Sequence, residues 1–418
     1  MRIDRITSRF AVLRFFLPRF AGFCLFAFYF SLAPQGVAQT GGSPHPPQPP
    51  GVSFKVLHTF GKTAGDGALP AGSFCMAGNS FYIMTLAGGA GNSGAICRIN
   101  IASGECSVLH SFTRSEGHNF GMSLTLAGPD LYGTAEFGGE KDAGTIFKYN
   151  IPAGEFTLLH SFTGKDGASP VGSLVLSGPD LYGMTAHGGQ GSGVIFKYDI
   201  AGGKLTVLHS FTEKDGVYPQ GSLALAGTDL YGTTSFGGAG DCGVIFKYSI
   251  PEGKVTLLHS FTGKDGFNPC GFLTISCTAL YGMAFRGGAE FRGGIRHHDG
   301  AQGCGVIFKC DALTGKVKVL HSFDPAVEGA WPDGGLTLSG TRLYGMTSEG
   351  GPGGYGTVFS FDTKKGVLCL LHSFTNGADG GSAAGNLELI GKTLYGLAGG
   401  GGDEGKGVLF SISGKSIK

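Results

Sequence analysis

Charged residues are scarce in this chain, and their signs nearly cancel. They make up 15% of the 418 residues, and the formal net charge at pH 7 is +1. Without a basic excess the protein has no positive field to attract phosphates, so we expect no nucleic-acid partner. The low charge also disfavours long solvated helices, whereas the 79 glycines favour short strands joined by tight turns.

Motifs typical of catalytic and phosphate-binding sites are missing as well. No Gly-x-Ser-x-Gly sequence, which positions the nucleophile of many hydrolases, occurs in the chain. The Gly-rich segment at 188–193 precedes a predicted strand, so it lacks the amide groups with which a helix start cradles phosphate. We therefore assign no catalytic residue and no cofactor, and we expect no metal site.

Residues 1–38 differ in composition from everything after them. Five arginines precede an apolar run at 21–33, which is shorter than a bilayer-spanning helix, and small residues suit cleavage before Gln39. This pattern predicts a signal peptide, with an uncleaved anchor as the alternative. The Pro- and Gly-rich segment 39–52 predicts a linker. We expect an exported protein, periplasmic, secreted or at the cell surface, with no membrane span after cleavage.

One motif, Leu-His-x-Phe, recurs seven times at spacings of 49 to 62 residues. Its histidines are His58, His110, His160, His209, His259, His321 and His372. Each copy belongs to a repeat of four apolar, β-prone runs separated by turn residues. A lone four-stranded sheet leaves open edges and an unburied face, whereas seven sheets in a ring cover one another. The repeat therefore predicts an all-β fold, a seven-bladed β-propeller over residues 53–413 with a tail at 414–418.

The two ends of the repeat region complement each other. Residues 54–60 have the sequence of a fourth strand with no first strand before it, and residues 407–413 have that of a third strand with no fourth after it. The N-terminal strand is therefore predicted to complete the seventh blade and close the ring, which removes both open edges.

The repeat, LHSFTGKDGxxPxGSLxLxGxDLYGxTxxGGxxGxGVIFKY, resembles the GloVer tandem repeat of exported bacterial "choice-of-anchor" proteins. Its order of Tyr, Gly-Gly and third strand is also similar to kelch propeller blades. The resemblance covers about 360 residues and implies an exported repeat protein with no established activity. Members of the family carry varied anchors after the repeats, and none follows them here, which favours a periplasmic or freely secreted protein.

The longer connections of each blade are expected on one face, because the second-to-third and fourth-to-first connections emerge on the same side. Propellers generally bind ligands on such a face. An acidic residue precedes Gly at one equivalent position there, which is typical of a turn, with a calcium or ligand role as the alternative. These acids are Asp66, Glu116, Asp166, Asp215, Asp265, Glu328 and Asp379.

Two further features of this face are candidate binding elements. The position before the repeat's usual Pro varies, and Tyr218 and Trp331 could stack on a sugar ring there or simply anchor the loop. Blade five carries an insertion of about a dozen residues, which is either a binding loop or a neutral surface insertion. Its candidate residues are Arg292, Arg296, His297, His298 and Asp299.

The repeated histidines and the cysteines have mainly structural interpretations. The histidines are predicted to pack between blades with a backbone partner. Cys97 and Cys106 flank a hairpin of blade one and could form a disulfide. Three more cysteines, Cys242, Cys270 and Cys304, map to the long-loop face around blades four and five, where a disulfide would pin the insertion. The alternative is that these three cysteines bind zinc together with a histidine.

Taken together, the sequence favours an exported, monomeric, non-catalytic binding or scaffold propeller whose ligand is a carbohydrate or another envelope protein. The alternative is a propeller-based polysaccharide lyase or glycosidase. Such an enzyme needs positioned acids that break the repeat symmetry, whereas the acids here mostly repeat in register. A purely structural surface repeat is the third reading.

Overall fold

The computed structural model of the protein describes residues 51–63, 65–70, 72–120, 123–289, 303–415 and 417. All of them belong to the second of two compact units, His45–Lys418, the first being Met1–Pro44. Within the described residues every regular element is a strand, and no helix long and apolar enough to cross a membrane is found there. The predicted signal peptide and most of the predicted linker lie outside the described residues.

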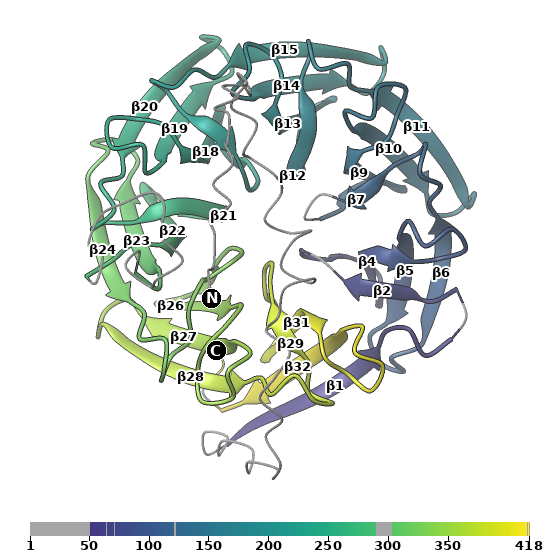
Figure 1. Ribbon diagram of the computed structural model, residues 1–418, viewed down its shortest axis with the longest axis vertical. Coiled ribbons are helices and arrows are strands. Elements are labelled where there is room, and N and C mark those ends of the chain that lie inside the picture. The colour runs from purple at the N-terminus through teal and green to yellow at the C-terminus, as the bar shows by residue number, and fades with distance from the viewer. Residues whose placement is uncertain are drawn as a thin grey trace, which may run out of the picture. The chain divides into compact units, whose positions relative to one another are not determined.

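Seven antiparallel sheets form a ring, as predicted (Figure 1). Blade one contains β2 (Gly67–Pro70), β3 (Cys75–Ala77), β4 (Ser80–Gly88), β5 (Ala95–Asn100) and β6 (Cys106–Ser111). Blade two contains β7 (His118–Phe120), β8 (Thr125–Ala127), β9 (Asp130–Phe137), β10 (Thr145–Asn150) and β11 (Glu155–Ser161). Blade three contains β12 (Ala168–Ser177), β13 (Asp180–His187), β14 (Val194–Asp199) and β15 (Lys204–Ser210).

Blade four contains β16 (Val217–Pro219), β17 (Ala224–Ala226), β18 (Asp229–Phe236), β19 (Val244–Ser249) and β20 (Lys254–Ser260). Blade five contains β21 (Phe267–Ser276), β22 (Ala279–Arg286), β23 (Val306–Asp311) and β24 (Val317–Ser322). Blade six contains β25 (Thr337–Ser339), β26 (Arg342–Thr347), β27 (Thr357–Asp362) and β28 (Val367–Ser373). Blade seven contains β29 (Gly381–Ala383), β30 (Glu388–Ile390), β31 (Thr393–Gly400), β32 (Val408–Gly414) and β1 (Val52–Thr59).

Each blade has four strand positions from the axis to the rim. The innermost strand is a single bulged strand in blades three and five, whereas in blades one, two, four and seven it forms two short pieces that pair with the same second strand. Second strands such as β9 and β13 are buried along nearly their whole length. Both faces of these strands are covered because neighbouring blades pack face to face, so the core lies between the blades.

The N-terminal strand closes the ring. β1 pairs antiparallel with β32, with Phe54 opposite Ile412 and Thr59 opposite Val408. Figure 1 shows the purple β1 along the outer edge of the yellow seventh blade. The two ends of the repeat region thus form one sheet, as predicted. The predicted seven-bladed propeller fold is confirmed.

Glycines let the innermost strands approach one another around the axis. A Cβ added to Gly172 would collide with the backbone of Gly221 in the next blade, and the same relation continues around the ring. The further members of the series are Gly271, Gly334, Gly385 and Gly72. Only Gly permits this approach, so the Gly that follows the repeat's Pro fixes how closely the blades converge.

Candidate functional site

A histidine–acid pair links each outer strand to the connection that follows it. The imidazole Nε2 lies 2.7 to 3.1 Å from a carboxylate oxygen in five pairs, including His160–Asp166 and His209–Asp215. The distance is 3.4 Å for His110–Glu116 and 3.6 Å for His58–Asp66. The prediction that the ring bonds a backbone group is therefore corrected, because its Nε2 faces a carboxylate.

The acid of each pair also organises its own turn. In the third blade's connection, Asp166 Oδ1 accepts hydrogen bonds from the backbone N–H of Thr163 at 2.8 Å and from its hydroxyl at 2.7 Å. Burial by itself would raise the pKa of Asp166, but the hydrogen bonds from Thr163 and His160 lower it overall. The carboxylates of Asp215, Asp265 and Asp379 have lowered pKa values for the same reasons. These contacts are those of turn-forming acids.

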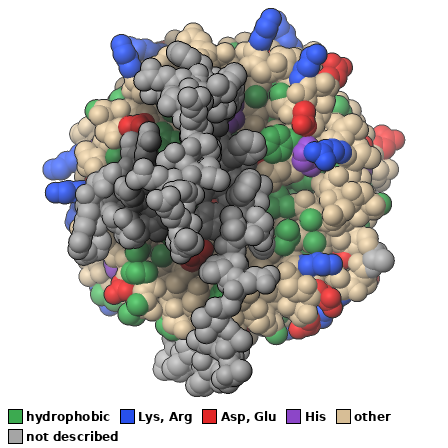
Figure 2. Space-filling model, viewed as in Figure 1, with side chains coloured by type: hydrophobic (Ala, Val, Ile, Leu, Met, Phe, Trp, Pro, Cys, Tyr) green, Lys and Arg blue, Asp and Glu red, His purple; other side chains and the backbone are tan. Residues whose placement is uncertain are grey.

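The two long connections of each blade lie on one face and touch. For example, Gly89 N–H donates to the Asp66 carbonyl at 3.1 Å, and Gly238 N–H donates to the Glu213 carbonyl at 3.2 Å. Each bond joins a second-to-third connection to the connection that precedes the same blade. On the part of the face that Figure 2 leaves uncovered, many of the Lys, Arg, Asp and Glu side chains lie along the rim.

The variable position before the repeat's Pro has one backbone geometry in every blade. Its φ lies between 51° and 63°, the left-handed region that most side chains avoid. The residues are Leu69, Asn119, Ser169, Tyr218, Asn268, Trp331 and Ser382. In six of them the backbone N–H donates to a carbonyl of the preceding blade, as from Trp331 to Cys304 at 3.0 Å. The backbone at this position therefore joins neighbouring blades, while its side chain is left to vary.

The two aromatic residues at this position belong to small clusters. Trp331 stacks on Phe285 with ring centroids 5.8 Å apart, and the Arg286 guanidinium lies 5.7 to 5.9 Å from both rings. Tyr218 OH lies 2.9 Å from His187 Nε2. The structure does not bring Tyr218 and Trp331 together, since they lead into blades four and six. The insertion candidates Arg292, Arg296, His297, His298 and Asp299 lie outside the described residues.

The cysteine candidates fall into two groups. Cys242 is buried and its thiol donates to the Gly240 carbonyl at 3.1 Å, whereas the Cys270 thiol donates to the Pro332 carbonyl at 3.5 Å. Cys97 and Cys106 lie on neighbouring strands of blade one, with Ile99 opposite Cys106, and carry free thiols. Among the described residues, these four cysteines form no disulfide.

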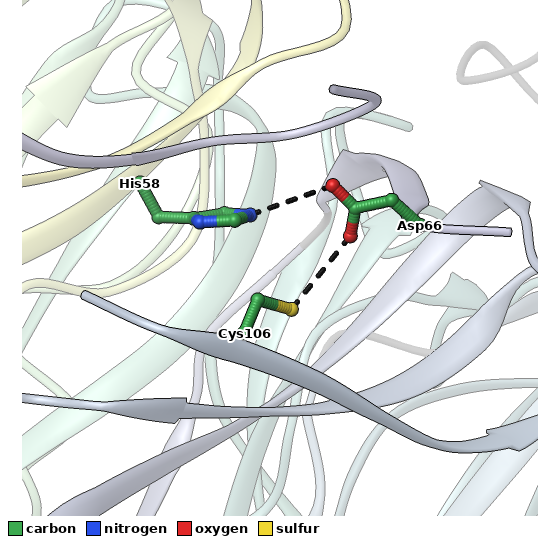
Figure 3. A group of neighbouring side chains, drawn as sticks. All are labelled: His58, Asp66 and Cys106. Carbon is green, nitrogen blue, oxygen red and sulfur yellow. Dashed lines mark hydrogen bonds and ion pairs between the residues drawn. The ribbon is translucent and has the colours of Figure 1, made fainter. Parts of the chain in front are cut away.

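One chemically mixed cluster lies where blade seven meets blade one. His58 from β1, Asp66 from the connection before β2, and Cys106 from β6 point toward one another (Figure 3). Their ligand atoms all lie within 4.8 Å of each other, and Cys106 Sγ is 3.7 Å from Asp66 Oδ1. Burial by itself would lower the pKa of His58, but its interactions with Asp66 and Cys106 raise it to about 9. We call these three residues the seam cluster.

Sequence reasoning missed the seam cluster, although the repeat contained a signal for it. At the position of Cys106 the other outer strands carry Phe, Leu or Val, and at the position of Cys97 the other third strands carry Phe. A cleft of about 400 Å³ opens beside the cluster on the long-loop face. Its lining includes Asp66, Lys62, Asn92 and Lys406.

Seven repeated blades, each with its histidine–acid pair, define this protein as a tandem-repeat β-propeller. A family model described as the Gloeobacter/Verrucomicrobia repeat matches residues 28–178, 123–296 and 294–417. The chain therefore belongs to the Gloeobacter/Verrucomicrobia repeat family, in agreement with the resemblance noted from its motifs. A search of curated proteins found no match.

Several solved propellers are similar in fold at low sequence identity. An oligogalacturonate lyase from Vibrio parahaemolyticus has a TM-score of 0.55 at 11% identity, covering 88% of this chain and 98% of its own. An oligogalacturonate lyase in complex with manganese has a TM-score of 0.53 at 11% identity, with 88% and 97% covered. A puromycin-hydrolyzing peptidase from Mycobacterium tuberculosis has a TM-score of 0.53 at 11% identity, with 86% and 55% covered. At these identities the likeness concerns the fold alone.

Proposed function

We propose that this protein is an exported, non-catalytic binding or scaffold propeller that recognises a carbohydrate or another envelope protein on its long-loop face. The observation that carries the proposal is the variable position before the repeat's Pro. Its backbone is held in the left-handed region in all seven blades, yet its side chain ranges from Ser to Trp. A bulky side chain in that conformation is strained, and strain of this kind is concentrated at functional sites.

Trp331 is the best anchor for a ligand. Its indole, the only one in the chain, is stacked on Phe285 and lies beside the Arg286 guanidinium. Aromatic faces pack against the apolar faces of sugars, and Trp and Arg are enriched at the centres of protein interfaces. Phe285 and Arg286 are at the end of β22, immediately before the insertion of blade five. This arrangement supports a site at the boundary of blades five and six.

The acids that repeat in register support binding rather than catalysis. The acids repeated on the long-loop face are engaged by histidines and turn hydroxyls, as Asp166 and Asp215 are. A lyase or glycosidase instead needs acids or bases that are free to act on the substrate. The fold shared with oligogalacturonate lyases nevertheless makes a polysaccharide-active enzyme the second candidate.

The test is a binding screen of the mature protein against glycans and envelope proteins. We expect a hit that weakens at least tenfold in Trp331→Ala and in a variant lacking residues 290–302. Leu313→Ala is the matched control, because Leu313 is 81% exposed in a short turn between β23 and β24 and should leave binding unchanged. A hit that survives both changes would move the site away from blades five and six.

Incubation with oligogalacturonates and other acidic polysaccharides separates the two candidates. We expect no unsaturated or hydrolysed product from the wild-type protein. Product formation that requires a described acid would replace the binding proposal with the enzymatic one.

A further inference from the structure

We propose that the seam cluster binds one Zn²⁺ ion that fastens blade seven to blade one. The site would use the His58 imidazole, the Asp66 carboxylate and the Cys106 thiolate. It is distinct from the Trp331 cluster at the boundary of blades five and six and does not depend on the function proposed there.

The spacing of the seam cluster suits a tetrahedral ion. Zn²⁺ binds imidazole nitrogen, carboxylate oxygen and thiolate sulfur at about 2.0 to 2.3 Å, which places the ligand atoms roughly 3.3 to 3.8 Å apart. His58 Nε2 lies 3.6 Å from Asp66 Oδ2, and Cys106 Sγ lies 3.7 Å from Asp66 Oδ1. The Cys106 thiol donates a hydrogen bond to the Asp66 carboxylate, whereas the separation of the His58 and Asp66 atoms is long for a hydrogen bond. Both separations suit atoms that share one metal ion.

His58 differs from the other repeated histidines in what it faces. Its Nε2 is buried and makes no hydrogen bond, whereas the Nε2 of His209 lies 2.8 Å from its acid. A buried nitrogen in this state calls for an explanation such as an ion. His110 also has a buried Nε2 without a hydrogen bond, but an aromatic ring rather than a thiol lies beside it. Among the described residues, only the His58–Asp66 pair has a thiol as a further potential ligand beside it.

The comparison with other blades shows why the thiol is unusual. Phe156, at the position of Cys106, stacks on His110 with ring centroids 4.2 Å apart, and Phe54 stacks on His372 at 3.8 Å. In these two cases the outer-strand histidine packs on an apolar residue of the next blade. At the seam, Cys106 replaces that hydrocarbon with a soft sulfur ligand, which favours zinc.

Cys97 lies beside the seam cluster but is not part of it. Its sulfur would lie 3.1 Å from a Cβ added to Gly67, the residue next to Asp66, whereas the ligand atoms within 4.8 Å of one another belong to His58, Asp66 and Cys106. One sulfur, one nitrogen and one oxygen leave the fourth position of a tetrahedral zinc ion to water, and binding releases the thiol proton of Cys106. The N–H groups of Gly61 and Gly67 donate to the Asp66 carboxylate at 3.0 and 2.9 Å and would hold it in place.

The consequence is a cross-link at the point where the ring closes. His58 is on β1, the outer strand of blade seven, whereas Cys106 is on β6 of blade one. An ion held by both blades stabilises the closed ring by binding the folded state and not the separated strands.

The experiment is a titration of the reduced, metal-free mature protein with Co²⁺ and then Zn²⁺. We expect one equivalent of Co²⁺ with a thiolate-to-cobalt charge-transfer band, displacement by Zn²⁺, and a higher melting temperature with Zn²⁺. Cys106→Val should abolish the band and the melting shift, and it should fold because Val255 and Val317 occupy the equivalent position. His58→Gln should weaken the metal at least tenfold, and His209→Gln, its matched control in a regular pair, should not.

Three results would overturn the proposal. The first is the absence of a charge-transfer band in the wild-type protein, and the second is unchanged metal affinity in Cys106→Val. The third is a Cys97–Cys106 disulfide under non-reducing mass spectrometry, because Cys106 could then not act as a thiolate ligand. Cys97→Ala is the matched thiol control and should keep the band, since Cys97 is not one of the three ligands.

Discussion

Blade one and the other six blades fill the same core position with different side chains. In blade three, Gly183 of β13 lies opposite Phe196 of β14, and an added Cβ would collide with that ring and with Leu174. The same Gly and Phe face each other in blades two, four, five, six and seven. In blade one Ile83 lies opposite Cys97, and both are fully buried.

The difference shows that the side chain on the second strand and the side chain opposite it on the third strand must match in size. A ring on the third strand needs an empty space on the second strand, and a branched side chain on the second strand needs a small partner on the third. Blade one has a large side chain on the second strand and a small one on the third, which is the reverse of the other blades. The core stays filled, and a thiol stands where the other blades carry a ring. The thiol of Cys97 then lies near Gly67, the residue next to Asp66, so the different packing of blade one also changes the chemistry of its core.

The largest expected effect comes from removing the strand that makes blade seven whole. Deletion of residues 53–60 leaves β32 with an unpaired edge and exposes the face of β31 and β32. We expect aggregation or loss of the cooperative unfolding transition, measured by size-exclusion chromatography and calorimetry. A truncation of residues 39–50 is the matched control and should keep the melting temperature. A soluble monomer with unchanged melting after the first deletion would contradict closure.

A smaller effect tests the exchange of volumes directly. Gly183→Ile should lower the free energy of unfolding by about 1 to 3 kcal/mol, because it overpacks the space held by Phe196 and Leu174. Phe196→Cys alone should lower it by about 3 kcal/mol, because it leaves a cavity. The double variant reproduces the pair of blade one and should be more stable than the sum of the two losses predicts.

Denaturant unfolding of the three variants measures this coupling. Additive losses would mean that Gly and Phe are independent. The reciprocal pair in blade one, Ile83→Gly with Cys97→Phe, is the control for the direction of the exchange and should show coupling of the same sign.

The regular histidine–acid pairs predict that the stability lost when the acid is replaced depends on pH. Burial alone would raise the pKa of Asp215, but its bonds from Thr212 and His209 lower it below its ordinary value near 4. A lowered folded pKa means that the carboxylate stabilises the fold above about pH 4 and that this contribution disappears as the pH falls through the folded pKa. Asp215→Asn should therefore be about 1 kcal/mol less stable than wild type near pH 7, with the gap closing in acid.

Unfolding of both proteins between about pH 3 and 7 checks this difference. Asp199→Asn is a useful comparison, because the Asp199 carboxylate accepts hydrogen bonds from the backbone N–H groups of Ala201 and Gly202 in an exposed turn rather than from a histidine. A constant gap for Asp215→Asn across the whole range would contradict the assigned ionisation.

The smallest effect concerns the variable position before the repeat's Pro. Ser382→Asn should change the free energy of unfolding by less than about 0.5 kcal/mol, because Asn tolerates the left-handed region and the bond to Tyr355 comes from the backbone. Ser382→Val should lose about 1 to 2 kcal/mol, because a β-branched residue does not tolerate it. Equal stability of the two variants would remove the link between backbone strain and this site.

Much of the candidate site was accessible from sequence, although not all of it was recognised. The acid follows the histidine by six residues in pairs such as His160–Asp166 and His209–Asp215, so a constant offset pointed to a contact within each repeat. The backbone partner was predicted instead because alternation along a strand says which face a side chain occupies and not which group meets it. The left-handed backbone of Tyr218 and Trp331 carried no sequence signal, since such residues rarely adopt it.

The sequence by itself determined the seven blades, the strand order within them and the closure by β1, because periodicity and complementary ends are properties of the chain. Only the tertiary structure decided that His58, Asp66 and Cys106 meet, since 40 residues separate the last two and the first belongs to another blade. Contacts between blades depend on how whole sheets pack against one another. The pattern of residue types along the chain does not give the distances between side chains of different blades.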